Sequence, residues 1–177
     1  MRRNGKVKQG NHRLSPLAVL LEAQKVAAKG KVKEALKLLR KGLSVAKETR
    51  DKRAQSLIHS EIGLCYQEKG QTNQALKEFE KAYQTSPNSS TCLLMLGTTY
   101  LERGDLENAG KYLTQALTLA EEEHRKGKFA KDPSNLLNAC LLLSKASRNL
   151  ATKSLQFGLK KFPGHPLLKQ ELQALAD

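Results

Sequence analysis

Histidine and cysteine are the residues of this chain best suited to catalysis or metal binding, and their spacing supports neither. The histidines have no cysteine or carboxylate at ligand spacing; they are His12, His59, His124 and His165. The cysteines, Cys65, Cys92 and Cys140, form no zinc or disulfide pattern. HExxH, GxSxG and phosphate-loop motifs are absent from the sequence. We therefore predict a protein that is not an enzyme and that uses no metal or cofactor.

Basic side chains are the second group that could do chemistry, by binding an anionic partner. The chain has 31 Lys+Arg against 17 Asp+Glu, a net charge of +14. Residues 1–60 hold 16 basic and 4 acidic residues, whereas residues 61–177 hold 15 and 13. Such an asymmetry points to a polyanion at one end of the molecule. The predicted anionic-partner patch comprises Arg2, Arg3, Lys6, Lys8, Arg13, Lys33, Lys37, Arg40, Lys41 and Lys47.

The patch divides into an N-terminal arm and a helix face. Residues 1–14 have too few apolar side chains to order themselves, which predicts a flexible basic arm. The other five cations recur at helical spacing on one side of a helix, away from its apolar residues. A solvated face that only aids solubility is the alternative. Because no aromatic residue precedes Tyr66, the patch favours phosphate contact over base stacking.

The elements that carry these residues are helices throughout. Apolar residues recur at three- and four-residue steps from Ser15 onward, and no alternating strand pattern occurs, so the fold class is all-α. No apolar run is long enough to span a membrane. The sequence has no apolar segment typical of a secretory signal, and its cysteines suit a reducing compartment, so we expect the cytoplasm or nucleus and no secretion. The run Glu121-Glu122-Glu123 is typical of a solvated helix extension.

An internal repeat sets the architecture. Three segments share a Gly followed five residues later by Ala, at Gly30–Ala35, Gly70–Ala75 and Gly104–Ala109. The small and aromatic residues around them suit two closely packed helices joined by a tight turn. The residues predicted to have these structural roles are Gly63, Tyr66, Gly70, Ala75, Phe79, Pro87, Gly97, Tyr100, Gly104 and Ala109.

This pattern resembles the tetratricopeptide repeat (TPR) family. The resemblance implies a right-handed superhelical solenoid of antiparallel helix pairs, with units at about 16–53, 56–89, 90–126 and 132–164 and a capping helix at 165–177. The middle two units match the pattern closely. The first has Glu22 and Val26 at positions where Leu and Tyr are expected, and the fourth has Ala146 where the turn Gly is expected.

The resemblance also implies a concave groove lined by the first helix of each unit. The residues projected onto it are mostly apolar or uncharged: Leu20, Leu57, Ser60, Leu64, Gln67, Thr91, Leu94, Thr98, Leu101, Leu136 and Cys140. An apolar wall of this kind suits a helix or extended peptide of a partner protein. The alternative is that these leucines pack into neighbouring units.

Some members of the family hold the acidic C-termini of heat-shock chaperones with inward Lys, Arg and Asn side chains. The matching positions here are Leu20, Gln24, Glu61, Thr91 and Met95, so we predict no carboxylate clamp. The sequence thus predicts a non-enzymatic interaction module, such as an adaptor, scaffold or assembly subunit. The alternative function is a nucleic-acid- or ribonucleoprotein-associated subunit that docks through the basic first third.

Overall fold

The computed structural model describes residues 15–127, 134–146 and 148–176, and within these ranges it contains nine helices and no strand. The first three helix pairs are α1 (Pro16–Ala28) with α2 (Val32–Glu48), α3 (Lys52–Glu68) with α4 (Thr72–Thr85), and α5 (Ser90–Glu102) with α6 (Leu106–Arg125). They are followed by α7 (Ser134–Ala146), α8 (Arg148–Lys161) and α9 (Pro166–Ala176).

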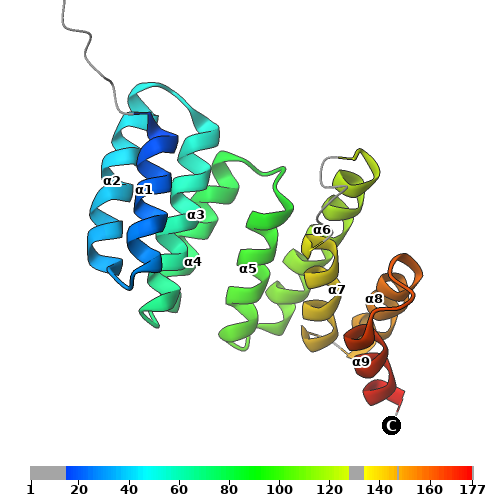
Figure 1. The fold of residues 1–177 in the computed structure, drawn as a ribbon. Helices are drawn as coiled ribbons and strands as arrows, with labels where there is room; N and C mark the ends of the chain where they lie inside the picture. Colours follow the sequence, from blue (N-terminus) through cyan, green and yellow to red (C-terminus); the bar gives the residue numbers. More distant parts are fainter. Residues whose placement is uncertain (1–14, 128–133, 147, 177) are drawn as a thin grey trace, which may run out of the picture.

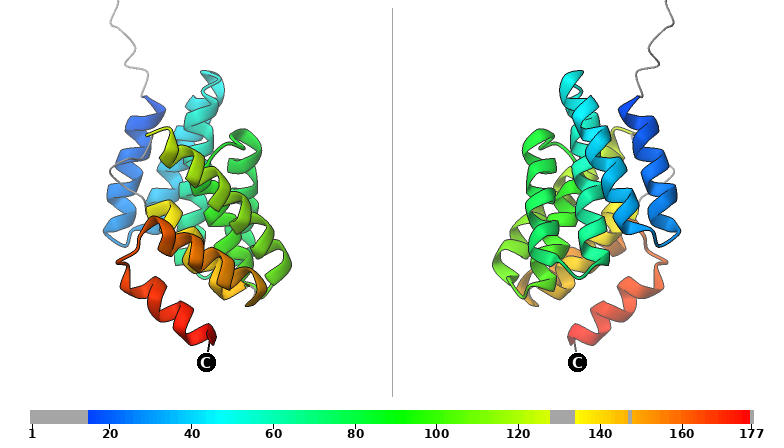
Figure 2. Two further views of the ribbon diagram at one scale, coloured as in Figure 1. Left: turned by 90° about the vertical axis from the view of Figure 1, so that its right-hand side faces the viewer. Right: turned by 90° about the vertical axis from the view of Figure 1, so that its left-hand side faces the viewer.

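The helices stack in chain order from α1–α2 at one end to α8–α9 at the other (Figures 1 and 2). Each helix packs chiefly on its sequence neighbours, and α1 also contacts α3 while α5 contacts α7. Contacts between successive units, rather than one central core, are the defining feature of a solenoid. The predicted all-α helical-repeat fold is therefore confirmed.

Tight turns between paired helices depend on glycine. Gly30, Gly70 and Gly104 have φ values of +75°, +68° and +76°, in the left-handed region where a side chain is strained. Three helices begin with a polar N-cap residue. The side chains of Asp51, Ser89 and Asp105 accept backbone N–H groups of the first turn in α3, α5 and α6.

The two helices of each middle pair approach closely because glycine faces a large side chain. A Cβ added to Gly63 would lie 2.7 Å from Phe79 Cδ1, and one added to Gly97 would lie 2.6 Å from Leu113 Cδ2. Phe79 and Leu113 are fully buried. The size difference between glycine and these side chains therefore sets the spacing between helices in both pairs.

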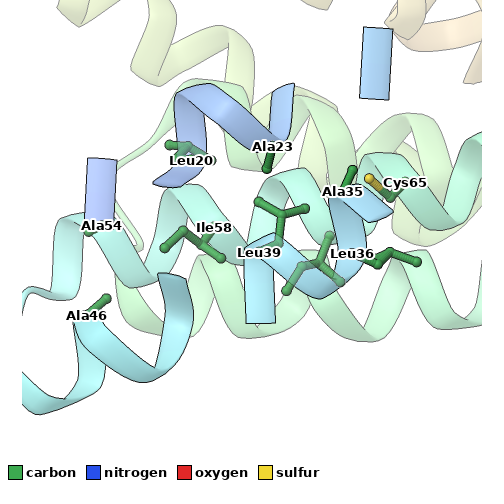
Figure 3. Packing of buried hydrophobic residues seen from close by; sticks show 10 residues of the cluster. Leu20, Ala23, Ala35, Leu36, Leu39, Ala46, Ala54, Ile58 and Cys65 are labelled. Atoms are coloured by element: carbon green, nitrogen blue, oxygen red, sulfur yellow. The ribbon is translucent and has the colours of Figure 1, made fainter. Parts of the chain in front are cut away.

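The first pair is joined to the second by a continuous apolar cluster. Leu20 and Ala23 of α1, Leu36 and Leu39 of α2, and Ile58 of α3 pack together (Figure 3). Short side chains such as Ala35 and Cys65 lie at the same contacts (Figure 3). Because this cluster includes both helices of the first pair and the next inner helix, it fixes α1 relative to α3.

Helix bounds differ from the predicted unit bounds at two places. The pair formed by α3 and α4 begins at Lys52, before the predicted start at 56, because Asp51 caps the helix there. Helix α6 extends over 20 residues to Arg125. Its last turns pass beyond the part that pairs with α5, and this extension brings Glu123 beside Ser90.

Candidate functional site: an inner groove and a basic helix face

A groove of about 590 Å³ lies along the inner helices of the first three pairs. Helix α1 supplies Leu20 and Gln24, and α5 supplies Thr91, Cys92 and Met95. The remaining lining residues come from α3, the α4–α5 connection and α6: Arg53, Ser56, Leu57, Ser60, Glu61, Ser86, Asn88, Ser89 and Glu123. The groove is therefore a product of three helix pairs, and no single repeat contains it.

Small side chains form the floor of the groove. Ser56, Ser60 and Cys92 are buried. The Ser56 hydroxyl donates to the Ala82 carbonyl at 2.9 Å, and Ser60 Oγ lies 3.6 Å from Cys92 Sγ. These contacts hold the floor in place and satisfy its polar atoms, so the groove is a stable feature of the packing rather than a packing defect.

The walls of the groove combine apolar and polar groups. Leu57 is 41% exposed, which is unusual for leucine, and Met95 is half-buried. Gln24 Nε2 donates to Glu61 Oε1 at 2.5 Å across the gap between α1 and α3. Thr91 is exposed at the opposite rim. A ligand in the groove would thus meet apolar surface and hydrogen-bonding groups together.

Charge in the groove is mixed, which corrects the prediction of an apolar groove. Arg53 is exposed in the first turn of α3, and Glu61 lies two turns further along the same helix. Glu123 is buried and accepts a short hydrogen bond from the Ser90 hydroxyl. The prediction that its acidic run is a solvated extension is therefore wrong for Glu123, because the long α6 carries this residue back to the start of α5.

Four of the predicted groove residues line the observed groove: Leu20, Leu57, Ser60 and Thr91. The other described ones do not. Leu94 is buried in a cluster with Ala139 and Leu143, and Cys140 is buried against Leu155 and Leu168. Leu94 belongs to the core because α7 packs against α5, and Cys140, on α7 itself, belongs to the core because α8 and α9 cover it.

The remaining projected residues are held by the chain itself. Leu64 and Leu101 are partly buried against neighbouring clusters. Gln67 Nε2 donates to Glu102 at 3.1 Å, and the Thr98 hydroxyl donates to the Leu94 carbonyl at 2.8 Å. The side chain of Leu136 lies outside the described residues. For Leu64 and Leu101, as for Leu94 and Cys140, packing into neighbouring units is the observed role.

Sequence reasoning missed Arg53, Asn88 and Glu123 as lining residues. Arg53 precedes the predicted start of its unit, and Asn88 lies in a connection. A signal for Arg53 existed, because Asp51 followed by an apolar-periodic segment marks a helix start there. The sequence indicated the helix extension that contains Glu123, but it gave no signal that Glu123 would be buried against Ser90.

All five positions that correspond to the carboxylate clamp line the groove: Leu20, Gln24, Glu61, Thr91 and Met95. None is basic, and Glu61 is a carboxylate. The projection thus placed these five positions on the lining of one groove, and their side chains differ in chemistry from a clamp.

The five helix cations of the predicted patch are all exposed on α2: Lys33, Lys37, Arg40, Lys41 and Lys47. Arg40 Nη2 donates to the Tyr66 hydroxyl at 3.3 Å, and Lys69 Nζ lies 6.0 Å from the centre of the Tyr66 ring. The structure therefore places an aromatic residue and a further cation beside the face. The arm cations Arg2, Arg3, Lys6, Lys8 and Arg13 lie outside the described residues.

The three cysteines and His59 contribute to packing. Cys65, Cys92 and Cys140 are buried and free. Burial raises the pKa of the Cys65 and Cys140 thiols to about 11, so both stay protonated and unreactive near neutral pH. His59 Nδ1 lies 2.7 Å from Glu78 Oε2 between α3 and α4. Across the described part of the chain, no three metal-ligating side chains gather, and no helix there is long and apolar enough to cross a bilayer.

Solved structures of TPR proteins share this fold at low sequence identity. A Podosopora anserina putative kinesin light chain with nearly identical TPR-like repeats superposes with a TM-score of 0.70 at 19% identity, over 90% of this chain and 84% of that one. YrrB, a TPR protein with an unusual peptide-binding site, gives 0.66 at 17% identity over 93% and 77%. The second TPR of Spaghetti, bound to the HSP90 peptide SRMEEVD, gives 0.53 at 16% over 60% and 94%.

No curated protein matches this chain in sequence. The family model of the SusR N-terminal TPR domain does match it, over residues 9–129. This span covers the first three helix pairs, which are the pairs that build the groove and carry the basic face. Because the match extends over more than half of the sequence, the chain belongs to the SusR N-terminal TPR domain family, and it is a tetratricopeptide repeat protein.

Proposed function

We propose that this protein is a non-enzymatic adaptor that holds an extended segment of a partner protein in the groove between α1, α3 and α5. The TPR fold indicates a protein–protein interaction module in general. The observation that supports this particular site is the 590 Å³ groove, whose floor of Ser56, Ser60 and Cys92 leaves room for a ligand.

An extended peptide suits the groove because its backbone needs hydrogen-bonding partners that this surface supplies. Gln24, Asn88 and Thr91 are exposed along the walls. Leu57 and Met95 offer apolar surface to one side chain of the ligand. Two of the structurally similar proteins, YrrB and the second TPR of Spaghetti, are described as peptide-binding or peptide-bound, which supports a peptide ligand here.

The partner segment is neutral or basic near the centre of the groove. Glu61 occupies a clamp-equivalent position, so an acidic side chain opposite it would be repelled. We therefore propose that the acidic peptide SRMEEVD, which the second TPR of Spaghetti binds, does not bind to this chain.

The proposal is tested with a displayed library of random extended peptides, selected against the full chain. Selected peptides are then measured by fluorescence anisotropy with the Leu57→Asp, Thr91→Arg double variant. Both residues are exposed, so the variant keeps its fold while its new charges block the groove. We expect binding to weaken at least about tenfold, which corresponds to roughly 1.4 kcal/mol. Lys77→Glu, on the exposed side of α4, is the control and should leave binding unchanged. The proposal is wrong if no peptide is enriched, or if the enriched peptides bind the double variant as well as the native chain.

A second candidate function is association with a nucleic acid through the basic first third of the chain. One observation favours it: all five predicted α2 cations are exposed on the described structure. This surface belongs to the outer helix of the first pair, and none of its residues lines the groove.

A further inference from the structure

The basic face of α2 consists of Lys33, Lys37, Arg40, Lys41 and Lys47. At 1.5 Å per residue, Lys33 and Lys47 are separated by about 21 Å along the helix axis, with a cation at almost every turn between them. The two acidic residues of α2 have partners of their own. Glu34 accepts from Lys31 at 3.5 Å, and Glu48 accepts from the Ser44 hydroxyl at 3.4 Å. The face therefore carries positive charge along most of its length, with the carboxylate of Glu48 near its C-terminal end.

Packing of the repeats does not require these charges. The register set by Ala35, Ala75 and Ala109 aligns α2 with α4 and α6, and so provides an internal comparison. The residues that correspond to Lys33 are Asn73 and Glu107, and those that correspond to Arg40 are Glu80 and Thr114. The contact between Arg40 and the Tyr66 hydroxyl has an equivalent in the next unit with an acidic residue, because the Tyr100 hydroxyl donates to Glu80 at 3.3 Å. Lysine recurs at the Lys37 position, as Lys77 and Lys111, whereas the Lys33 and Arg40 positions accept neutral or acidic residues. Only α2 has cations at all five positions.

The row of cations continues into a recess that the sequence did not indicate. Lys31 and Lys33, at the start of α2, lie with Lys69 of the neighbouring pair around a hollow of about 330 Å³. Glu34 also lines this hollow, and it pairs with Lys31, so Lys33 and Lys69 are the cations left for a phosphate. Gly30 and Val32 form its apolar part. This volume is at the lower end of the range for small-ligand sites, about 300–1,000 Å³. Tyr66 lies beside it, since Lys69 Nζ is 6.0 Å from that ring and Arg40 donates to its hydroxyl.

We infer that the α2 face binds single-stranded nucleic acid, with the phosphates along the cation row and one nucleotide in the recess between Lys33 and Lys69. The inference deepens the second candidate function and is independent of peptide binding in the groove. Phosphate contact carries little sequence information, so binding is tolerant of sequence.

The surface fits a single strand better than a duplex or a membrane. Nucleotides of a duplex are held in the base stack, and turning one into a recess costs a few kcal/mol. A membrane-binding basic helix needs large apolar side chains that enter the bilayer interface beside its cations. The exposed large apolar residues of the described structure are Leu17, Leu21, Leu57, Leu106 and Leu167, and none of them is on α2.

The test measures fluorescence anisotropy of a labelled oligouridylate of roughly 15 nucleotides, a length within the site sizes of single-strand binders. The full chain is compared with the Lys33→Glu, Lys37→Glu, Lys41→Glu variant between about 50 and 200 mM salt. Loss of three phosphate contacts at a slope of about 0.7 each should lower the dependence of log K on log salt by about 2. At about 100 mM salt we expect at least tenfold weaker binding.

The matched control is Lys111→Glu, Lys160→Glu, Lys169→Glu, which changes the net charge equally at exposed sites on α6, α8 and α9. We expect it to bind nearly as well as the native chain. Lys69→Glu should weaken binding about as much as a single α2 substitution, because only the fold brings Lys69 to the face. If the triple Glu variant loses helicity, Gln at the same three positions removes the charges with little change in helix propensity.

The outcomes separate the inference from the function that it deepens. Equal losses in the α2 and control variants would overturn the inference and leave nucleic-acid association standing. The same conclusion would follow if the oligouridylate paired with oligoadenylate in a duplex bound as tightly as the single strand. If the chain binds no nucleic acid at about 50 mM salt, both the inference and the second candidate function are overturned. The same holds if it binds none and instead sediments with phosphatidylserine vesicles. Peptide binding in the groove should be the same in all of these variants.

Discussion

Equivalent positions on α3 and α5 behave in opposite ways on the inner surface of the solenoid. Ser60, three residues before Gly63, is part of the groove floor, whereas Leu94, three residues before Gly97, packs against Ala139 and Leu143 of α7. Both lie on the same helix face in the same repeat register. The difference shows that this position is filled where the following inner helix packs closely, as α7 does on α5, and stays open to a ligand where it does not, as between α3 and α5.

The comparison depends on a rigid repeat framework. Of the substitutions considered, we expect Ala75→Glu to destabilise that framework most. Ala75 is fully buried between the helices of its pair, so a glutamate there places an unpaired charge in the core. We expect the free energy of unfolding to fall by about 3–5 kcal/mol. Thermal unfolding followed by circular dichroism measures this. A cooperative transition at an unchanged temperature would mean that the helix pairing is wrong.

The contrast between filled and open inner surface is sharpened by comparing Leu94→Ala with Leu57→Ala. Leu94 is 7% exposed in the core, and we expect its truncation to lower the free energy of unfolding by about 2–5 kcal/mol. Leu57 is 41% exposed in the groove, and we expect a change within about 0.5 kcal/mol. Urea denaturation of both variants measures the difference. Equal losses would contradict the division between core and groove.

The smallest expected effect is a pH dependence at Glu78, which lies between α4 and α3 where it contacts His59. Burial raises the pKa of this carboxyl, but hydrogen bonds from His59 and Lys81 outweigh burial, so the pKa lies below its usual value of 4.5. A lowered folded-state pKa stabilises the fold above the unfolded-state value, and this contribution is lost as pH falls through the folded-state value. We therefore expect the melting temperature to decrease as pH falls below about 4.5, and Glu78→Gln to lack this part of the dependence. An identical pH profile in native and variant protein would exclude Glu78 as its source.

Local patterns determined the helices, their turns and their pairing. The left-handed turns at positions 70 and 104 favour glycine, because few other residues adopt that conformation at low cost. Ala75 and Phe79 recur at helical spacing in a frame that matches Ala109 and Leu113, so two in-register units could be identified from sequence alone. The clamp-equivalent positions followed from the same frame, and all of them do line the groove.

Tertiary packing alone decided which part of the inner surface is open and what chemistry it has. Leu94 and Cys140 look like groove residues in sequence, and they become core because α7 and α9 pack over them. Glu123 enters the groove because α6 is long enough to carry it back to Ser90, and Lys69 joins Lys33 because two separate turns meet at one end of the first two pairs. A repeat pattern specifies contacts within a unit, which are local in sequence. The open and charged surfaces arise between units, where the neighbouring helix and its length determine what is covered.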